Sequence, residues 1–196
     1  MIKNTKVQFV IFETSLQAEP FIERWKEYKR SPKSDTDVTI QQTKHKKSFR
    51  YIAQHRLTDD QIQFVFSRGK NNTGAPQKSI KLNLAGGYTL LQSEETNGAG
   101  PNQSKIIAFI TEPKADLKMF KELSEGGKLN IYEPYFLNCK FEYILEYFVN
   151  NKKADILLEQ LKNLDIVDVA VYEEFKKVKN VNEPKKEEEL HVWPSV

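Results

Sequence analysis

The residue types that most often carry chemistry are scarce in this sequence. It contains three histidines and one cysteine, and they do not show the spacing of a metal site such as H-E-x-x-H. Because Cys139 is the only thiol, no zinc site of several thiolates and no internal disulfide can form. No P-loop, G-x-G-x-x-G or G-x-S-x-G motif is present. The sequence therefore predicts no metal and no cofactor, and it identifies no catalytic residue.

Cationic side chains near the ends of two predicted strands are the first candidates for a binding site. His55 and Arg56 end one strand, and Arg68 follows the next. If these three side chains line one rim, they can bind an anionic ligand. A solvent-exposed or strand-edge position is the alternative for each of them.

Aromatic side chains are dense between residues 132 and 148. On a strand over 141–149, alternation places Phe141, Tyr143, Leu145 and Tyr147 on one face. Such a stripe is typical of a core, but a sheet lined with tyrosines also suits a small planar ligand. Glu133, Glu142 and Glu146 would supply the polar groups of such a pocket. Together with the rim, the candidate ligand-binding residues are His55, Arg56, Arg68, Tyr132, Tyr143, Tyr147 and Glu142.

A basic segment offers a different hypothesis, RNA or single-stranded DNA binding. Between residues 23 and 56 there are ten Lys or Arg against four Asp or Glu, and the run KSFRYIA alternates charged and aromatic side chains. This resembles the strand on which RNA-recognition modules stack bases, although the glycines of that signature are missing. A solvated basic edge is the simpler interpretation. The nucleic-acid candidates are Lys46, Lys47, Phe49, Arg50 and Tyr51.

The composition is that of a folded globular protein. Hydrophobic residues make up 39% and charged residues 29% of 196 residues, and the formal net charge is +3. A charge this small does not indicate nucleic acid by itself. There is no apolar stretch long enough to cross a bilayer, so we expect no membrane, and the single cysteine fits the reducing cytoplasm.

The elements that would position these residues divide the chain into two halves. Residues 1–92 read as an N-terminal α+β half, with strands at 6–12, 38–42, 48–54, 61–67 and 79–91 and a helix after Pro20. Gly86 and Gly87 predict a bulge or bend in the last strand. Residues 93–104 are predicted as a linker loop, and residues 176–196 as a charged tail in which Trp193 either docks or is disordered.

The C-terminal half, residues 105–175, alternates strands and helices in the order βαββαβ. Strands are predicted at 105–111, 128–137, 141–149 and 166–175, and helices at 115–124 and 154–163. This order is similar to the ferredoxin-like, dimeric α+β barrel superfamily. The resemblance implies an α+β protein with antiparallel sheets, helices on one face and two ferredoxin-like halves. A weak sequence similarity between Phe9–Glu13 and Phe109–Glu112 favours an internal duplication.

The resulting functional hypotheses belong to three classes. The leading one is a module that binds a small ligand or a protein partner through its aromatic sheet face. The second is a small cofactor-independent enzyme of the oxygenase or isomerase kind, which the resemblance implies, with His55, Arg56 or Tyr143 as polar participants. The third is the nucleic-acid module. The protein is expected to be either a monomer whose two halves close on each other or a homodimer whose open sheets pack against each other.

Overall fold

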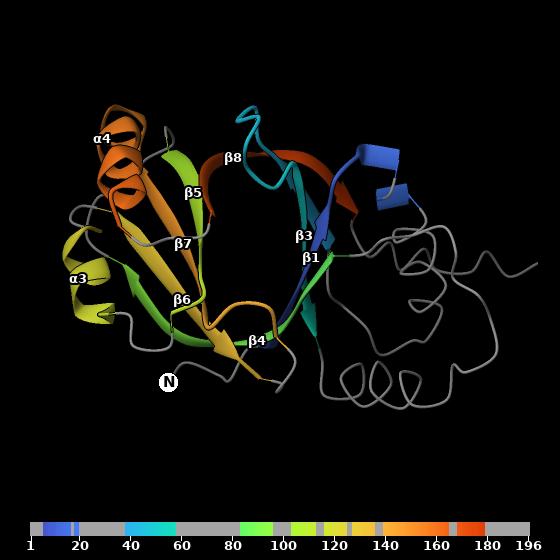
Figure 1. The fold of residues 1–196 in the computed structure, drawn as a ribbon, viewed down its shortest axis with the longest axis horizontal. Coiled ribbons are helices and arrows are strands. Elements are labelled where there is room, and N and C mark those ends of the chain that lie inside the picture. The colour runs from blue at the N-terminus through green and yellow to red at the C-terminus, as the bar shows by residue number, and fades with distance from the viewer. Residues whose placement is uncertain are drawn as a thin grey trace, which may run out of the picture.

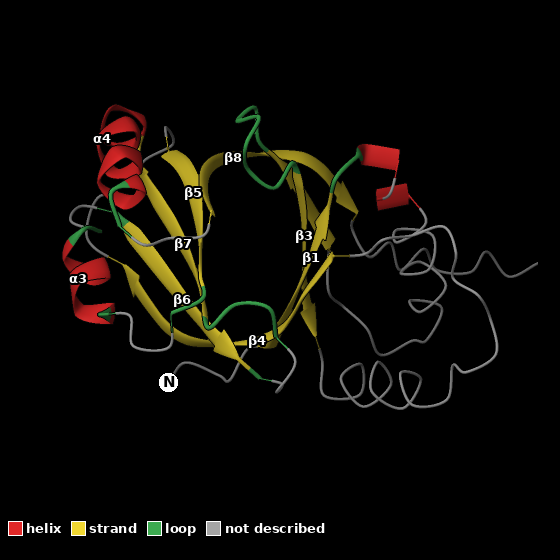
Figure 2. Ribbon diagram, viewed as in Figure 1, coloured by secondary structure: helices red, strands yellow, loops and turns green. Residues whose placement is uncertain are grey.

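The computed structural model describes residues 6–16, 18–19, 38–57, 83–95, 103–112, 116–124, 127–135, 139–164 and 168–178. Its centre is a closed barrel of antiparallel strands in the order β1-β3-β2-β8-β5-β7-β6-β4, with β4 pairing back onto β1 (Figures 1 and 2). The strands are β1 (Lys6–Phe12), β2 (Val38–Gln42), β3 (Tyr51–Leu57), β4 (Asn83–Glu95), β5 (Gln103–Ile110), β6 (Lys128–Pro134), β7 (Tyr143–Asn150) and β8 (Asp168–Val178).

The expected fold class, an α+β protein of two ferredoxin-like halves, is wrong. The edges that two open sheets would leave unpaired are joined, because β2 pairs with β8 and β4 pairs with β6. Closure satisfies the backbone groups of those edges without a partner chain. The resemblance to the dimeric α+β barrel superfamily fails for the same reason.

The two halves contribute strands in the same relative order, β4-β1-β3-β2 and β8-β5-β7-β6. A duplicated origin and the proposed domain limits stay predictions. The ends of three strands extend into the predicted linker and tail, since β4 runs to Glu95, β5 begins at Gln103 and β8 continues to Val178. The remainder of the tail, the helix after Pro20 and the strand at 61–67 lie outside the described residues.

Two short helices, α3 (Leu117–Glu122) and α4 (Asn151–Lys162), cover the outer face of the strands from the second half (Figure 2). Each begins at a polar cap that the sequence analysis did not identify: Asp116 accepts from the amides of Lys118 and Met119, and Asn150 accepts from that of Lys152. Leu157, Leu158 and Leu161 of α4 are buried against the sheet. The barrel wall is therefore buried on both sides here, which accounts for its continuous apolar strands.

The barrel interior is apolar and aromatic at one end. The loop between β2 and β3 places Phe49 against Phe109 and Phe141, with ring centroids 5.2 and 5.9 Å away. Its main chain is fixed by Asp168, whose carboxylate accepts from the Phe49 amide at 2.9 Å, and by Tyr172, whose hydroxyl donates to the Phe49 carbonyl at 2.9 Å. We call Phe49, Phe109 and Phe141 the aromatic plug.

The predicted bulge at the paired glycines is confirmed. Gly86 has a φ of +122°, and the pairing of β1 with β4 shifts register at Phe9 and Val10. A Cβ at position 86 would lie 2.7 Å from the sulfur of Cys139, so both the backbone and the packing require glycine. The bend lets β4 turn from β1 to β6 and close the barrel.

Candidate functional site

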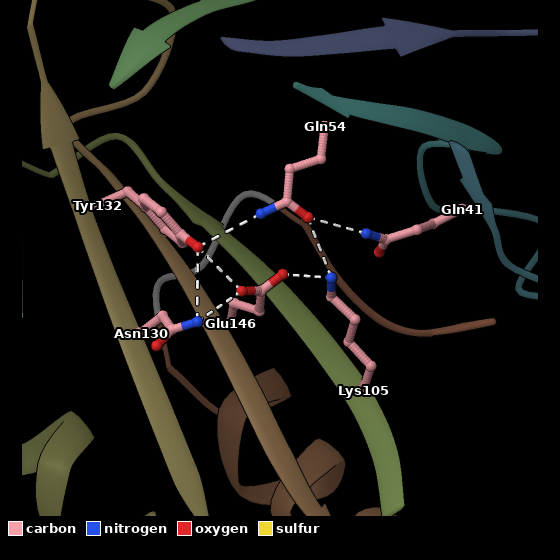
Figure 3. A network of polar contacts seen from close by, with 6 residues as sticks. All are labelled: Gln41, Gln54, Lys105, Asn130, Tyr132 and Glu146. Carbon is pink, nitrogen blue, oxygen red and sulfur yellow. Dashed lines mark hydrogen bonds and ion pairs between the residues drawn. The ribbon is translucent and has the colours of Figure 1, made fainter. Parts of the chain in front are cut away.

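Beyond the apolar end, six polar side chains meet across the barrel interior. They come from five strands and form one connected network (Figure 3). We call it the polar layer; its members are Gln41 on β2, Gln54 on β3, Lys105 on β5, Asn130 and Tyr132 on β6, and Glu146 on β7.

Glu146 is the centre of the polar layer. Glu146 is only 2% exposed. One of its carboxylate oxygens accepts from Asn130 Nδ2 at 2.8 Å and from the Tyr132 hydroxyl at 3.0 Å. The other oxygen forms an ion pair with Lys105 Nζ. A buried carboxylate is tolerated when a cation and hydrogen bonds compensate its lost hydration, and here both are present.

Gln54 links this centre to the opposite wall. Its Nε2 donates to the Tyr132 hydroxyl at 3.3 Å, while its Oε1 accepts from Lys105 Nζ at 3.1 Å and from Gln41 Nε2 at 3.0 Å. Strands β3 and β6 are not neighbours in the barrel, so these bonds cross its interior. The polar layer therefore connects β2 and β3 of the N-terminal half to β5, β6 and β7 of the C-terminal half by hydrogen bonds.

The charges fix the protonation states of the polar layer. Burial raises the pKa of Glu146, but the Lys105 charge and the hydrogen bonds from Lys105, Asn130 and Tyr132 outweigh it, and the net effect lowers the pKa. For Tyr132, burial and the negative charge of Glu146 raise the pKa well above its usual value. Glu146 is thus ionised at neutral pH, and Tyr132 is a protonated donor.

A pocket of about 570 Å³ opens beside the polar layer. This volume is within the usual range for small-molecule sites. Two of its lining side chains carry buried polar atoms without a hydrogen-bond partner, the oxygen Oε1 of Gln41 and the nitrogen Nε2 of Gln103. The lining residues are Thr39, Gln41, Gln103, Ser104, Lys105, Phe148, Val171, Tyr172, Glu173 and Glu174.

The predicted ligand-binding residues are not brought together. Tyr132 belongs to the polar layer, but Tyr143 and Tyr147 face the helices, and the Tyr147 hydroxyl donates to the Phe120 carbonyl of α3 at 3.1 Å. Glu142 is exposed just before β7. The predicted alternation is confirmed for Tyr143, Leu145 and Tyr147, which face the helices, but it is wrong for Phe141, which lies before β7 and packs in the interior. The inner face of β7 carries Ile144, Glu146 and Phe148.

The predicted rim is also divided. His55 is buried on the outer face of β3, where its register partner is Val38 of the outer apolar cluster. Arg56 is exposed, and its charge reaches Tyr132, whose pKa it lowers slightly against the larger effect of burial. Arg68 lies outside the described residues. His55, Arg56 and Tyr143 therefore do not form one enzyme-like site.

The part of the basic segment between β2 and β3, residues 43–50, forms a loop with a turn at Lys46 and Lys47, so the strand predicted from Ser48 begins only at Tyr51. Lys46, Lys47 and Arg50 are exposed, but Phe49 belongs to the aromatic plug. Tyr51, the first residue of β3, packs against Phe175 with ring centroids 5.3 Å apart. The two aromatic rings thus have protein partners, and stacking on bases would require them to move.

Sequence reasoning named Glu146 only as a supporting group and missed Gln41, Gln54, Lys105 and Asn130. One signal was available, since Glu146 shares strand parity with Ile144 and Phe148, and a carboxylate on such an apolar face needs a buried partner. The partner itself, on another strand, could not be read from local spacing.

Among the residues that the structure describes, no three His, Cys, Asp or Glu side chains are placed to hold a metal ion together. No described helix is long and apolar enough to cross a membrane. The sequence matches no protein-family model and no curated protein.

Proposed function

We propose that this protein binds a small polar organic molecule in the barrel, in the pocket beside the polar layer. The observation that carries the proposal is the unpaired Oε1 of Gln41, in a residue only 2% exposed that lines the pocket. A buried acceptor without a partner costs about 1–3 kcal/mol, and a ligand that donates to it removes this cost.

The proposal keeps ligand binding as the predicted class of function but moves the site. The tyrosine face of β7 packs under α3 and α4, whereas the pocket is next to Lys105 and Phe148 on the inner face. A rigid wall supports recognition, because the strands and the polar layer hold the lining side chains before a ligand arrives. With one free cysteine, the cytoplasm is the compartment we propose.

Native mass spectrometry of the full chain tests the proposal. The purified protein is measured alone and after incubation with a small-molecule cell extract followed by buffer exchange. We expect one or a few defined adducts of small-molecule mass. The variant Gln41→Leu removes the unpaired acceptor and should lose them.

Gln42→Leu is the matched control, because the neighbouring Gln42 donates to Glu173 at 3.2 Å in an exposed contact. This variant should keep the adducts. Circular dichroism confirms that both variants fold. Absence of any adduct, or equal adducts in the two variants, would contradict the proposed function.

A further inference from the structure

Two unpaired polar atoms of opposite character flank one strand of the pocket. Gln41 on β2 presents a buried acceptor, and Gln103 on β5 presents a buried donor. Strand β8 lies between β2 and β5 in the barrel. A ligand that satisfies both atoms must therefore carry a donor at one end and an acceptor at the other.

Charged side chains reinforce each end. Glu174 of β8 is the register partner of Gln41, so a carboxylate lies beside the unpaired acceptor. Lys105 is two residues beyond Gln103, on the same face of β5. Its ammonium has three donors, of which Gln54 and Glu146 take one each, and it also lies 5.4 Å from the centroid of the Phe148 ring. A ligand carboxylate would accept from the third donor.

We propose that the ligand is a zwitterion with an amino group and a carboxylate, such as a free amino acid or a short peptide. This inference rests on the proposed function and deepens it. The amino group would donate to Gln41 Oε1 and Glu174, and the carboxylate would accept from Gln103 Nε2 and Lys105. Tyr172 of β8 provides apolar surface between these ends, and Phe148 of β7 lines the pocket beside Lys105.

The charge pattern disfavours simpler ligands. A plain anion would meet Glu173 and Glu174 at the pocket, and a plain cation would leave the unpaired donor of Gln103 without an acceptor. A neutral amide would satisfy the two unpaired atoms and leave the charges unused. These three classes are the competitors that the experiment must separate.

Isothermal titration calorimetry with matched compounds tests the inference. The panel comprises the α-amino acids, 4-aminobutanoate, 6-aminohexanoate and glycylglycine, each compared with the amine and the acid that lack one charge, and with the corresponding amide. We expect at least one zwitterion to bind about tenfold or more tighter than each of its matched analogues.

Glu174→Gln locates the amino end. It should weaken the zwitterion by about tenfold and strengthen binding of the matched acid, which then meets one negative charge fewer. Glu159→Gln is the control, because it removes the same charge from an exposed residue of α4 that does not line the pocket and pairs with Lys162 at 2.8 Å. Gln103→Leu should weaken the zwitterion and the acid, but not the amine.

The outcomes separate the inference from the proposed function. If an amide or a singly charged compound binds as tightly as its zwitterion, or if no zwitterion of the panel binds at millimolar concentration, the inference is wrong. The proposed function then stands as long as extract adducts depend on Gln41. If no extract adduct forms either, both are wrong.

Discussion

Replacement of Glu146 by glutamine tests whether the polar layer holds the barrel together. Glutamine keeps the size and one acceptor oxygen but removes the charge. The side chain of Glu146 is 3% exposed and that of Lys105 is 20% exposed, so water compensates the orphaned ammonium only in part. The two hydrogen bonds to Oε2, from Asn130 and Tyr132, lose charge assistance, about 1 kcal/mol each.

The lost ion pair adds to this effect, although Lys105 keeps its bond to Gln54. We expect a total loss of about 3 kcal/mol in the free energy of unfolding, at the lower end of the range for breaking buried pairs. Urea denaturation followed by circular dichroism measures it, and the melting temperature should fall by about 6–12 °C.

The double variant Lys105→Met with Glu146→Gln provides the control. Because it leaves no uncompensated charge, its loss should be smaller than the sum of the two single losses by about 2 kcal/mol. Additive losses, or a loss below about 1 kcal/mol for Glu146→Gln, would refute the buried charge pair as an important contact.

Three further predictions concern pH, the two faces of the wall and the plug. The folded pKa of Glu146 lies below its ordinary value of 4.5, so its contribution to the free energy of unfolding is full above pH 4.5 and is lost as pH falls through the folded pKa. The difference in the free energy of unfolding between the wild type and Glu146→Gln should therefore narrow below pH 4.5, as urea denaturation at several pH values will measure. A difference that stays constant with pH would show that the carboxyl is not ionised in the folded protein. Tyr132→Phe should lower the free energy of unfolding in urea by about 2 kcal/mol and should weaken ligand binding, because its hydroxyl belongs to the polar layer. Tyr147→Phe should lower the free energy of unfolding by about 1 kcal/mol and leave ligand binding unchanged, because its hydroxyl faces α3. If Tyr147→Phe weakens binding and Tyr132→Phe does not, the ligand lies on the helix side of the wall. Phe49→Ala should lower the free energy of unfolding in urea by about 2–3 kcal/mol, which is less than the loss for a fully buried phenylalanine because Phe49 is half-buried. A loss under about 1 kcal/mol would show that the aromatic plug is not well packed.

Local chemistry determined the strands and helices of this protein. The apolar run at Lys6–Phe12 and the strand Val38–Gln42 were predicted with their observed limits, because β-branched and aromatic residues specify strands locally. Other limits moved by a few residues, as for β3, which begins at Tyr51 and not at Ser48. The paired glycines predicted the bend in β4, since only glycine adopts a φ of +122° without strain.

Tertiary structure alone decided the closure of the barrel and the identity of its inner face. The period of a strand separates Tyr147 from Glu146, but it does not say which of them faces helices and which faces the interior. That choice depends on pairings such as β2 with β8, whose residues lie far apart in the chain. The Lys105–Glu146 pair arises in the same way, because an ion pair requires proximity in space, which closure of the barrel provides.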